Sequence, residues 1–171
     1  MLRAVGAGLL LMSCTAVGFR VAREFRQRPR HLRALIHALR VLEAEVDFNA
    51  APLPQALRRV VARSQPPADT LFGDMLHHLD DPACSPADAL AQAVATCQPK
   101  TALRATDVEV LRELGLTLGL SDRQHQTRQI QACILHLTQL EREAAQAQRH
   151  QERLWQYVGV LTGLLLVVLL Y

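Results

Sequence analysis

Between residues 20 and 46, the apolar and basic positions of the chain separate onto two sides of a helical wheel. The apolar side holds Leu32, Leu35, Ile36, Leu39, Leu42 and Val46. The opposite side holds Arg23, Arg26, Arg30, Arg33, His37 and Arg40. This pattern predicts one long amphipathic helix that begins near Arg20 and ends before Pro52, in which Pro29 permits a bend.

Prolines divide the middle of the chain into short helical segments. A proline fits the first turn of a helix, because an N–H there would have no intrahelical acceptor. On this basis we predict helices over Pro54–Arg63, Pro67–Leu79 and Pro86–Thr96. We expect these three helices to pack around the first one.

Two further helices follow. Thr106 and Asp107 form a helix start with a threonine cap and an acidic first turn, and we expect Gly119 to end that helix. Ser121 is the expected cap of a final helix with apolar positions at helical spacing: Ile130, Cys133, Ile134, Leu137, Leu140 and Ala144. Proline and glycine are absent from there to Gly159, so this helix is predicted to continue unbroken for about 75 Å over about 50 residues.

The sequence therefore predicts an all-α fold. Residues 21–153 form a six-helix bundle domain, and its long first and last helices pack together because they carry the longest apolar stripes.

Both ends of the chain are free of charged residues, from Ala4 to Phe19 and from Leu154 to Tyr171. Such stretches are typical of membrane-spanning helices, which need about 20 residues. We predict one transmembrane helix over residues 1–20 and another over residues 154–171. Trp155, Tyr157 and Tyr171 stand where interfacial aromatic residues are expected in the second span.

Arginines next to both spans predict the orientation, because positive charge is retained on the cytoplasmic side. Residues 21–153 are accordingly placed in the cytoplasm. Gly159 and Gly163 form a GxxxG pattern in the second span, which permits close helix packing. The pattern alone leaves open whether it packs the two spans together, joins subunits or does neither.

An alternative interpretation makes residues 1–19 an export signal. Leu11, Met12, Ser13 and Cys14 resemble a lipobox, which would leave Cys14 as a lipidated N-terminus of a peripheral helical binding module. The arginine-dense stretch after Phe19 argues against this interpretation, since it would resist translocation. Intact-mass measurement distinguishes the two.

The composition favours helices and gives little indication of a catalytic or metal site. Half of the 171 residues are apolar but only 4% are aromatic, and Lys100 is the only lysine beside many arginines, for a net charge of +3. The four cysteines show no CxxC spacing, and Cys14 and Cys133 occupy apolar patterns, as expected of buried thiols in a reducing compartment.

Motifs of catalytic and nucleotide-binding sites are missing from the sequence. The sole lysine lies between Pro99 and Thr101, which excludes a Walker loop, and neither HExxH nor GxSxG occurs. Potential metal ligands gather only at His77, His78, Asp80, Asp81 and Cys84. Adjacent histidines diverge by about 100° on a helix, so we interpret this cluster as a solvated helix end. The sequence predicts a non-enzymatic protein without cofactor or metal.

The arginine stripe allows several partners. Nucleic acid is not expected, since aromatic residues that could stack on bases are missing. Contact with anionic lipid headgroups and docking of an acidic protein both remain open. For docking, the candidate residues are Arg33, Arg40, Glu43 and Glu45.

Several segments resemble the stage III sporulation protein AB family (SpoIIIAB). They are residues 18–22 (Gly-Phe-Arg-Val-Ala), Arg28-Pro29-Arg30, residues 42–46, Leu118-Gly119-Leu120, and the closing run from Gly159. The match runs over nearly the whole chain and is weakest at residues 64–100. The resemblance implies a scaffold subunit of the sporulation channel complex between mother cell and forespore. It also implies a place in the outer forespore membrane, with the central domain in the mother-cell cytoplasm.

That family is in turn similar to the inner-membrane platform protein of type II secretion and type IV pilus systems (GspF-like). The similarity implies that the six-helix domain engages a secretion-type ATPase, here the sporulation ATPase of the same operon (SpoIIIAA-like). Other channel membrane proteins, membrane lipid and a second copy of the chain are the further partners it implies.

Overall fold

The computed structural model describes residues 27–49, 51–118 and 122–170, with side chains as far as Arg149. In this part of the chain, six α-helices and a short 3-10 helix are present and strands are absent. The predicted all-α class is confirmed. Residues Gln27–Arg142 form one compact unit, which is called the head below, and Glu143 and the rest of the C-terminal helix belong to a second unit.

The first helix covers residues 27–47 and supplies much of the core. All six apolar positions predicted for its inner side are buried, and Leu32, Leu35, Leu39 and Leu42 are completely so. Each such leucine contributes about 1.5–3 kcal/mol by leaving water. The sequence pattern and the observed burial agree at these six apolar positions.

The three short helices lie close to their predicted ranges. They are α2 (Leu53–Arg63), α3 (Ala68–His78) and α4 (Pro86–Cys97). Pro54 and Pro86 stand in the first turns of α2 and α4, while Pro67 immediately precedes α3. Helices α2 and α3 pack on each other, and α4 packs on both α3 and α5.

The 3-10 helix η1 (Gln98–Lys100) leads to α5 (Ala105–Thr117). Helix α5 can lie close against α4 because residue 115 is a glycine. A Cβ atom at Gly115 would lie 3.2 Å from Cδ2 of Leu90, which is buried.

One predicted cap is wrong. Thr106 does not cap α5, because the Asp107 carboxylate accepts the N–H of Arg104 at 2.8 Å and the helix begins at Ala105. At the start of α6 (Arg123–Leu170), Asp122 accepts the N–H of His125 at 3.2 Å and therefore acts as the cap. The predicted cap Ser121 and the predicted stop Gly119 lie outside the described residues.

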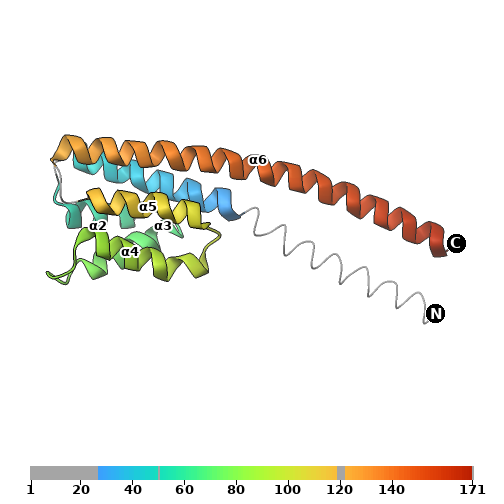
Figure 1. Cartoon of the computed structure of the whole chain (residues 1–171), viewed down its shortest axis with the longest axis horizontal. Coiled ribbons are helices and arrows are strands. Elements are labelled where there is room, and N and C mark those ends of the chain that lie inside the picture. Colours follow the sequence, from blue (N-terminus) through green and yellow to red (C-terminus); the bar gives the residue numbers. More distant parts are fainter. Residues whose placement is uncertain (1–26, 50, 119–121, 171) are drawn as a thin grey trace. The chain divides into compact units, whose positions relative to one another are not determined.

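The first helix and α6 pack side by side and antiparallel (Figure 1). Arg33 contacts Glu141 and Glu43 contacts Gln131, so a step of ten residues forward on one helix is a step of ten backward on the other. Leu39 and Leu137 are both fully buried. The predicted pairing of the long first and last helices is confirmed for the head.

In the described part of the chain, no helix meets the length and hydropathy required to cross a membrane. The finding gives no support to the two predicted spans. Residues 1–20 lie outside the described residues, and for residues 154–170 the structure gives the helical backbone of α6 without side chains. The division into residues 1–20, 21–153 and 154–171 stays a prediction.

Candidate functional site

The outer side of the first helix carries a basic face, which consists of Arg30, Arg33, His37 and Arg40. All four side chains are exposed, as the helical wheel predicted. The predicted members Arg23 and Arg26 lie outside the described residues. Arg33 is ion-paired with Glu141 of α6, with an Nη2 to Oε1 distance of 2.6 Å. Within the described part of the chain, Arg30 and Arg40 make no ion pair and are the uncompensated charges of this face.

The four residues predicted for partner docking have different surroundings. Arg40 is exposed and Arg33 is exposed but paired. Glu43 is half-buried beside α6, where its Oε1 accepts a 2.7 Å hydrogen bond from Gln131. Glu45 is buried, with only 3% of its surface exposed. Of these four residues, only Arg33 and Arg40 are exposed, and only Arg40 is both exposed and unpaired among the described residues.

The candidate docking residue Glu45 does not belong to an exposed face. Glu45 faces α2, where its carboxylate accepts hydrogen bonds from Arg59 and, at 2.7 Å, from Asn49, with Arg63 3.9 Å away. Burial by itself would raise the pKa of Glu45, but these hydrogen bonds and the charges of Arg59 and Arg63 hold the pKa below its ordinary value. Glu45 therefore fixes α2 to the end of the first helix.

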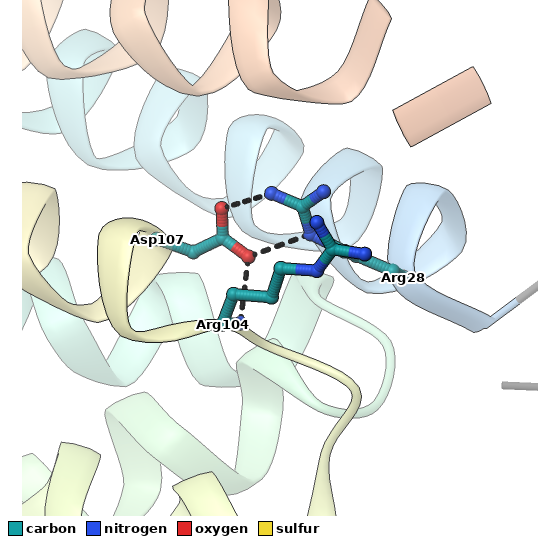
Figure 2. A network of polar contacts seen from close by, with 3 residues as sticks. All are labelled: Arg28, Arg104 and Asp107. Carbon is teal, nitrogen blue, oxygen red and sulfur yellow. Dashed lines mark hydrogen bonds and ion pairs between the residues drawn. The ribbon is translucent and has the colours of Figure 1, made fainter. Parts of the chain in front are cut away.

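Arg28 forms a buried ion pair with Asp107 of α5 that the sequence interpretation missed. Its Nη2 lies 2.7 Å from Oδ1 and its Nε 3.0 Å from Oδ2, a bidentate geometry that is shown in Figure 2. The Arg28 side chain is 11% exposed and that of Asp107 is fully buried. Because Asp107 also accepts the Arg104 N–H, one carboxylate both starts α5 and binds the first helix.

The helical angles of these two residues indicate the pair. Arg28 falls at the same angle as Leu35, Leu39 and Val46, in the middle of the apolar side. Asp107 precedes Leu111, Leu114 and Leu118 at helical spacing, so it lies on the buried side of α5. An arginine and an aspartate on two apolar faces are expected to pair, since an isolated buried charge is very costly.

His31 makes a second contact between the first helix and the segment before α5. Its Nδ1 accepts the backbone N–H of Ala102 at 3.1 Å, which requires that this nitrogen be unprotonated. Burial lowers the pKa of His31 and thereby favours the accepting form. Arg28 and His31 together attach residues 102–107 to the first helix.

The two buried thiols of the head, Cys97 and Cys133, are unsuited to nucleophilic chemistry. Burial raises the pKa of Cys133 to about 12, with a smaller contribution from Glu113. Burial and the nearby Asp74 likewise raise the pKa of Cys97. Both thiols are therefore protonated near neutral pH. Cys133 is buried as its apolar pattern predicted, whereas Cys14 lies outside the described residues.

The histidine and aspartate cluster lies at the end of α3. His77 is exposed in the last turn, and the Asp81 carboxylate accepts the N–H of Ala83 at 3.0 Å. Among the described residues, histidine, cysteine and carboxylate side chains do not converge as a metal site requires. Gly159 and Gly163 lie in the part of α6 for which side chains are not described, so their packing role stays a prediction.

Comparison with known proteins agrees with the resemblance seen in the sequence. A family model described as stage III sporulation protein AB matches residues 3–171. The chain is 35% identical over 170 residues to stage III sporulation protein AB of Bacillus subtilis (strain 168), with 99% of each chain covered. A solved structure of stage III sporulation protein AB (SpoIIIAB) has 34% identity and a TM-score of 0.67, with 72% of this chain and 98% of that chain covered. The chain belongs to the stage III sporulation protein AB family.

Proposed function

We propose that the chain is a non-enzymatic platform subunit of the sporulation channel complex between mother cell and forespore. In this role the head docks a secretion-type ATPase, the SpoIIIAA-like protein of the same operon. The observation that carries the proposal is the exposed basic face of the first helix, where Arg30 and Arg40 make no ion pair in the described part of the chain. Family membership supplies the context of sporulation.

A face of this kind is suited to docking for a physical reason. Exposed arginines are solvated at little cost, and their field attracts and orients an acidic partner before contact. Arg33 contributes less than its exposure suggests, since Glu141 already neutralises it. Arg40 is thus the residue on which docking should depend most.

The proposal includes anchoring in the outer forespore membrane through residues 1–20 and 154–171, with the head in the mother-cell cytoplasm. It is supported by the two uncharged stretches and by the arginines beside them. Gly159 and Gly163 would then allow close packing between spans or subunits. Channel membrane proteins, lipid and a second copy of the chain are further expected partners.

A non-enzymatic role is supported by the chemistry of the head. Its buried thiols hold raised pKa values, and its buried carboxylates Asp107 and Glu45 are occupied by arginines. These ionisable groups connect helices and are withdrawn from solvent, which favours a scaffold over a catalyst.

Charge reversal at position 40 tests the docking face. Arg40→Glu should leave helicity and the urea midpoint unchanged, because the side chain is exposed and unpaired, but should weaken binding to the purified ATPase and reduce spore formation. The matched control is Arg58→Glu on α2, an exposed arginine outside the basic face that makes no ion pair with the described residues and gives the same change in net charge. Reversal of Arg33 is a poorer test, since it would place two glutamates against each other. Normal ATPase binding and normal sporulation in Arg40→Glu would exclude this face.

The alternative of an exported, lipidated binding module is distinguished by the fate of residues 1–19. An intact chain in membrane extracts agrees with the proposal. A mass that corresponds to cleavage before Cys14 plus lipid would replace it with the exported module.

A further inference from the structure

Phe48 is the most exposed large apolar side chain in the described part of the chain, at 83%. It follows the last residue of the first helix, and its N–H donates to the carbonyl of Ala44 at 3.0 Å. This is the spacing of a helical hydrogen bond, so Phe48 continues the helical register although it stands in the turn. Its side chain direction is therefore related to those of the preceding turns.

That register aligns Phe48 with the basic face. At 100° per residue, Arg30, Arg33, His37, Arg40, Ala44, Asp47 and Phe48 fall within an arc of about 100°, and all seven are exposed. Eight residues separate Arg40 from Phe48, or about 12 Å along the axis. Ala44 lies between them and is too small to block a partner from contacting both.

A single exposed apolar residue does not by itself indicate a binding site, because such residues are common on protein surfaces. Phe48 differs in its surroundings, since it ends a row that contains two uncompensated arginines. Aromatic residues and arginines are the two types enriched at the energetic centres of interfaces. An aromatic ring also loses little side-chain entropy on binding.

We infer that Phe48 is the apolar anchor of the docking face. The inference rests on the proposed function and specifies the partner surface. That surface carries carboxylates opposite Arg30 and Arg40, which complements their charge, and an apolar pocket about 12 Å further along that receives the Phe48 ring. Asp47 precedes Phe48 in the sequence and is the acidic residue among the seven, so the margin of the pocket is expected to be polar or basic.

The test compares two truncations of exposed apolar residues in the full-length chain, with the purified ATPase of the same operon as the probe. Phe48→Ala removes the anchor, and Leu116→Ala on α5, 65% exposed and outside the basic face, is the matched control. We expect Phe48→Ala to weaken binding about tenfold or more, mainly through faster dissociation, and Leu116→Ala to change it less than about twofold.

The dependence of affinity on ionic strength distinguishes the contribution of Phe48 from that of the arginines. Phe48→Ala should leave the slope of affinity against ionic strength unchanged, whereas Arg40→Glu should reduce it. Phe48→Leu should bind the ATPase more tightly than Phe48→Ala, because it keeps an apolar side chain. If Phe48→Ala shifts the urea midpoint, Phe48→Leu replaces it as the test variant.

The outcomes are distinguishable. If Arg40→Glu weakens binding while Phe48→Ala and Phe48→Leu bind like the Leu116→Ala control, the anchor is wrong and the proposed function stands. If neither Arg40→Glu nor Phe48→Ala weakens binding, the proposed docking face fails together with its anchor.

Discussion

The first helix carries two sets of charges, one buried against other helices and one exposed to solvent. Toward the interior, Arg28 is buried against Asp107 of α5 and Glu45 is buried against Arg59 of α2. Toward solvent, Arg30 and Arg40 have no ion pair in the described part of the chain. One helix therefore uses similar residues to hold the bundle together on one side and to remain available on the other.

The difference shows that helical angle decides the role of an arginine here. Arg28 and Arg30 are two residues apart, and about 200° of rotation separates them. The first shares the angle of buried leucines, and the second shares the angle of Phe48. Substitutions on the inner side should therefore affect the free energy of unfolding, whereas those on the outer side should affect binding.

The largest expected effect on stability is at Asp107. Asp107→Ala leaves the Arg28 guanidinium buried without its partner and also removes the acceptor for the Arg104 N–H. We expect a loss of about 3–5 kcal/mol, which urea denaturation followed by circular dichroism would measure.

A double substitution controls for the cause. Arg28→Met with Asp107→Leu removes both charges and should recover much of the loss, because paired burial gains little over apolar packing. If the double variant is as unstable as Asp107→Ala, the missing contact is the cap at Arg104 and not the ion pair.

Much of the fold could be predicted from local sequence. The apolar positions of the first helix and the proline-marked starts near Pro54, Pro67 and Pro86 follow from periodicity and backbone chemistry, which act over a few residues. The caps were harder, because Thr106 and Asp107 can both accept a hydrogen bond and only the observed register distinguishes them.

The candidate site was predicted less completely, because charge pairing depends on residues far apart in sequence. Arg33 and Glu141 are 108 positions apart, and no local pattern indicates that one neutralises the other. Glu45 resembles an exposed residue until α2 brings Arg59 beside it. The helical angles of Arg28 and Asp107, in contrast, can be read from the sequence and place both residues on apolar faces.

Protonation of Glu45 at acid pH should weaken its contact with α2. The resulting loss of stability should be smaller than that of Asp107→Ala. The pKa of Glu45 is held below its ordinary value of 4.5, so its contribution to stability is complete above pH 4.5 and is lost as the pH falls through the lower folded value. Glu45→Gln removes this titration. The difference in urea midpoint between the wild type and Glu45→Gln should therefore be constant above pH 4.5 and shrink below it. A difference independent of pH would show that the charge of Glu45 is unimportant.

His31 should respond at higher pH and more weakly, because a single hydrogen bond depends on it. Burial lowers its pKa from 6.5, so the neutral form is favoured in the folded chain. The contribution of His31 to stability is complete above pH 6.5 and decreases as the pH falls toward the pKa of His31 in the folded chain. His31→Asn offers an acceptor to the Ala102 N–H without titrating. We expect the wild type, but not His31→Asn, to lose stability as the pH falls below 6.5; equal slopes would refute the role of this imidazole.

The smallest expected effect on stability is at Arg40, and it gives the sharpest form of the comparison. Arg40→Ala removes an exposed arginine with no ion pair in the described part of the chain, so the free energy of unfolding should stay within about 0.5 kcal/mol of the wild type. Arg28→Ala removes the same side chain twelve positions earlier in the same helix and should cost about 3–5 kcal/mol, because Asp107 is left as an unpaired buried carboxylate. Intrinsic helix propensity cannot produce this contrast, since both substitutions exchange arginine for alanine. A loss at Arg40 comparable to that at Arg28 would mean that the outer face also holds the bundle together.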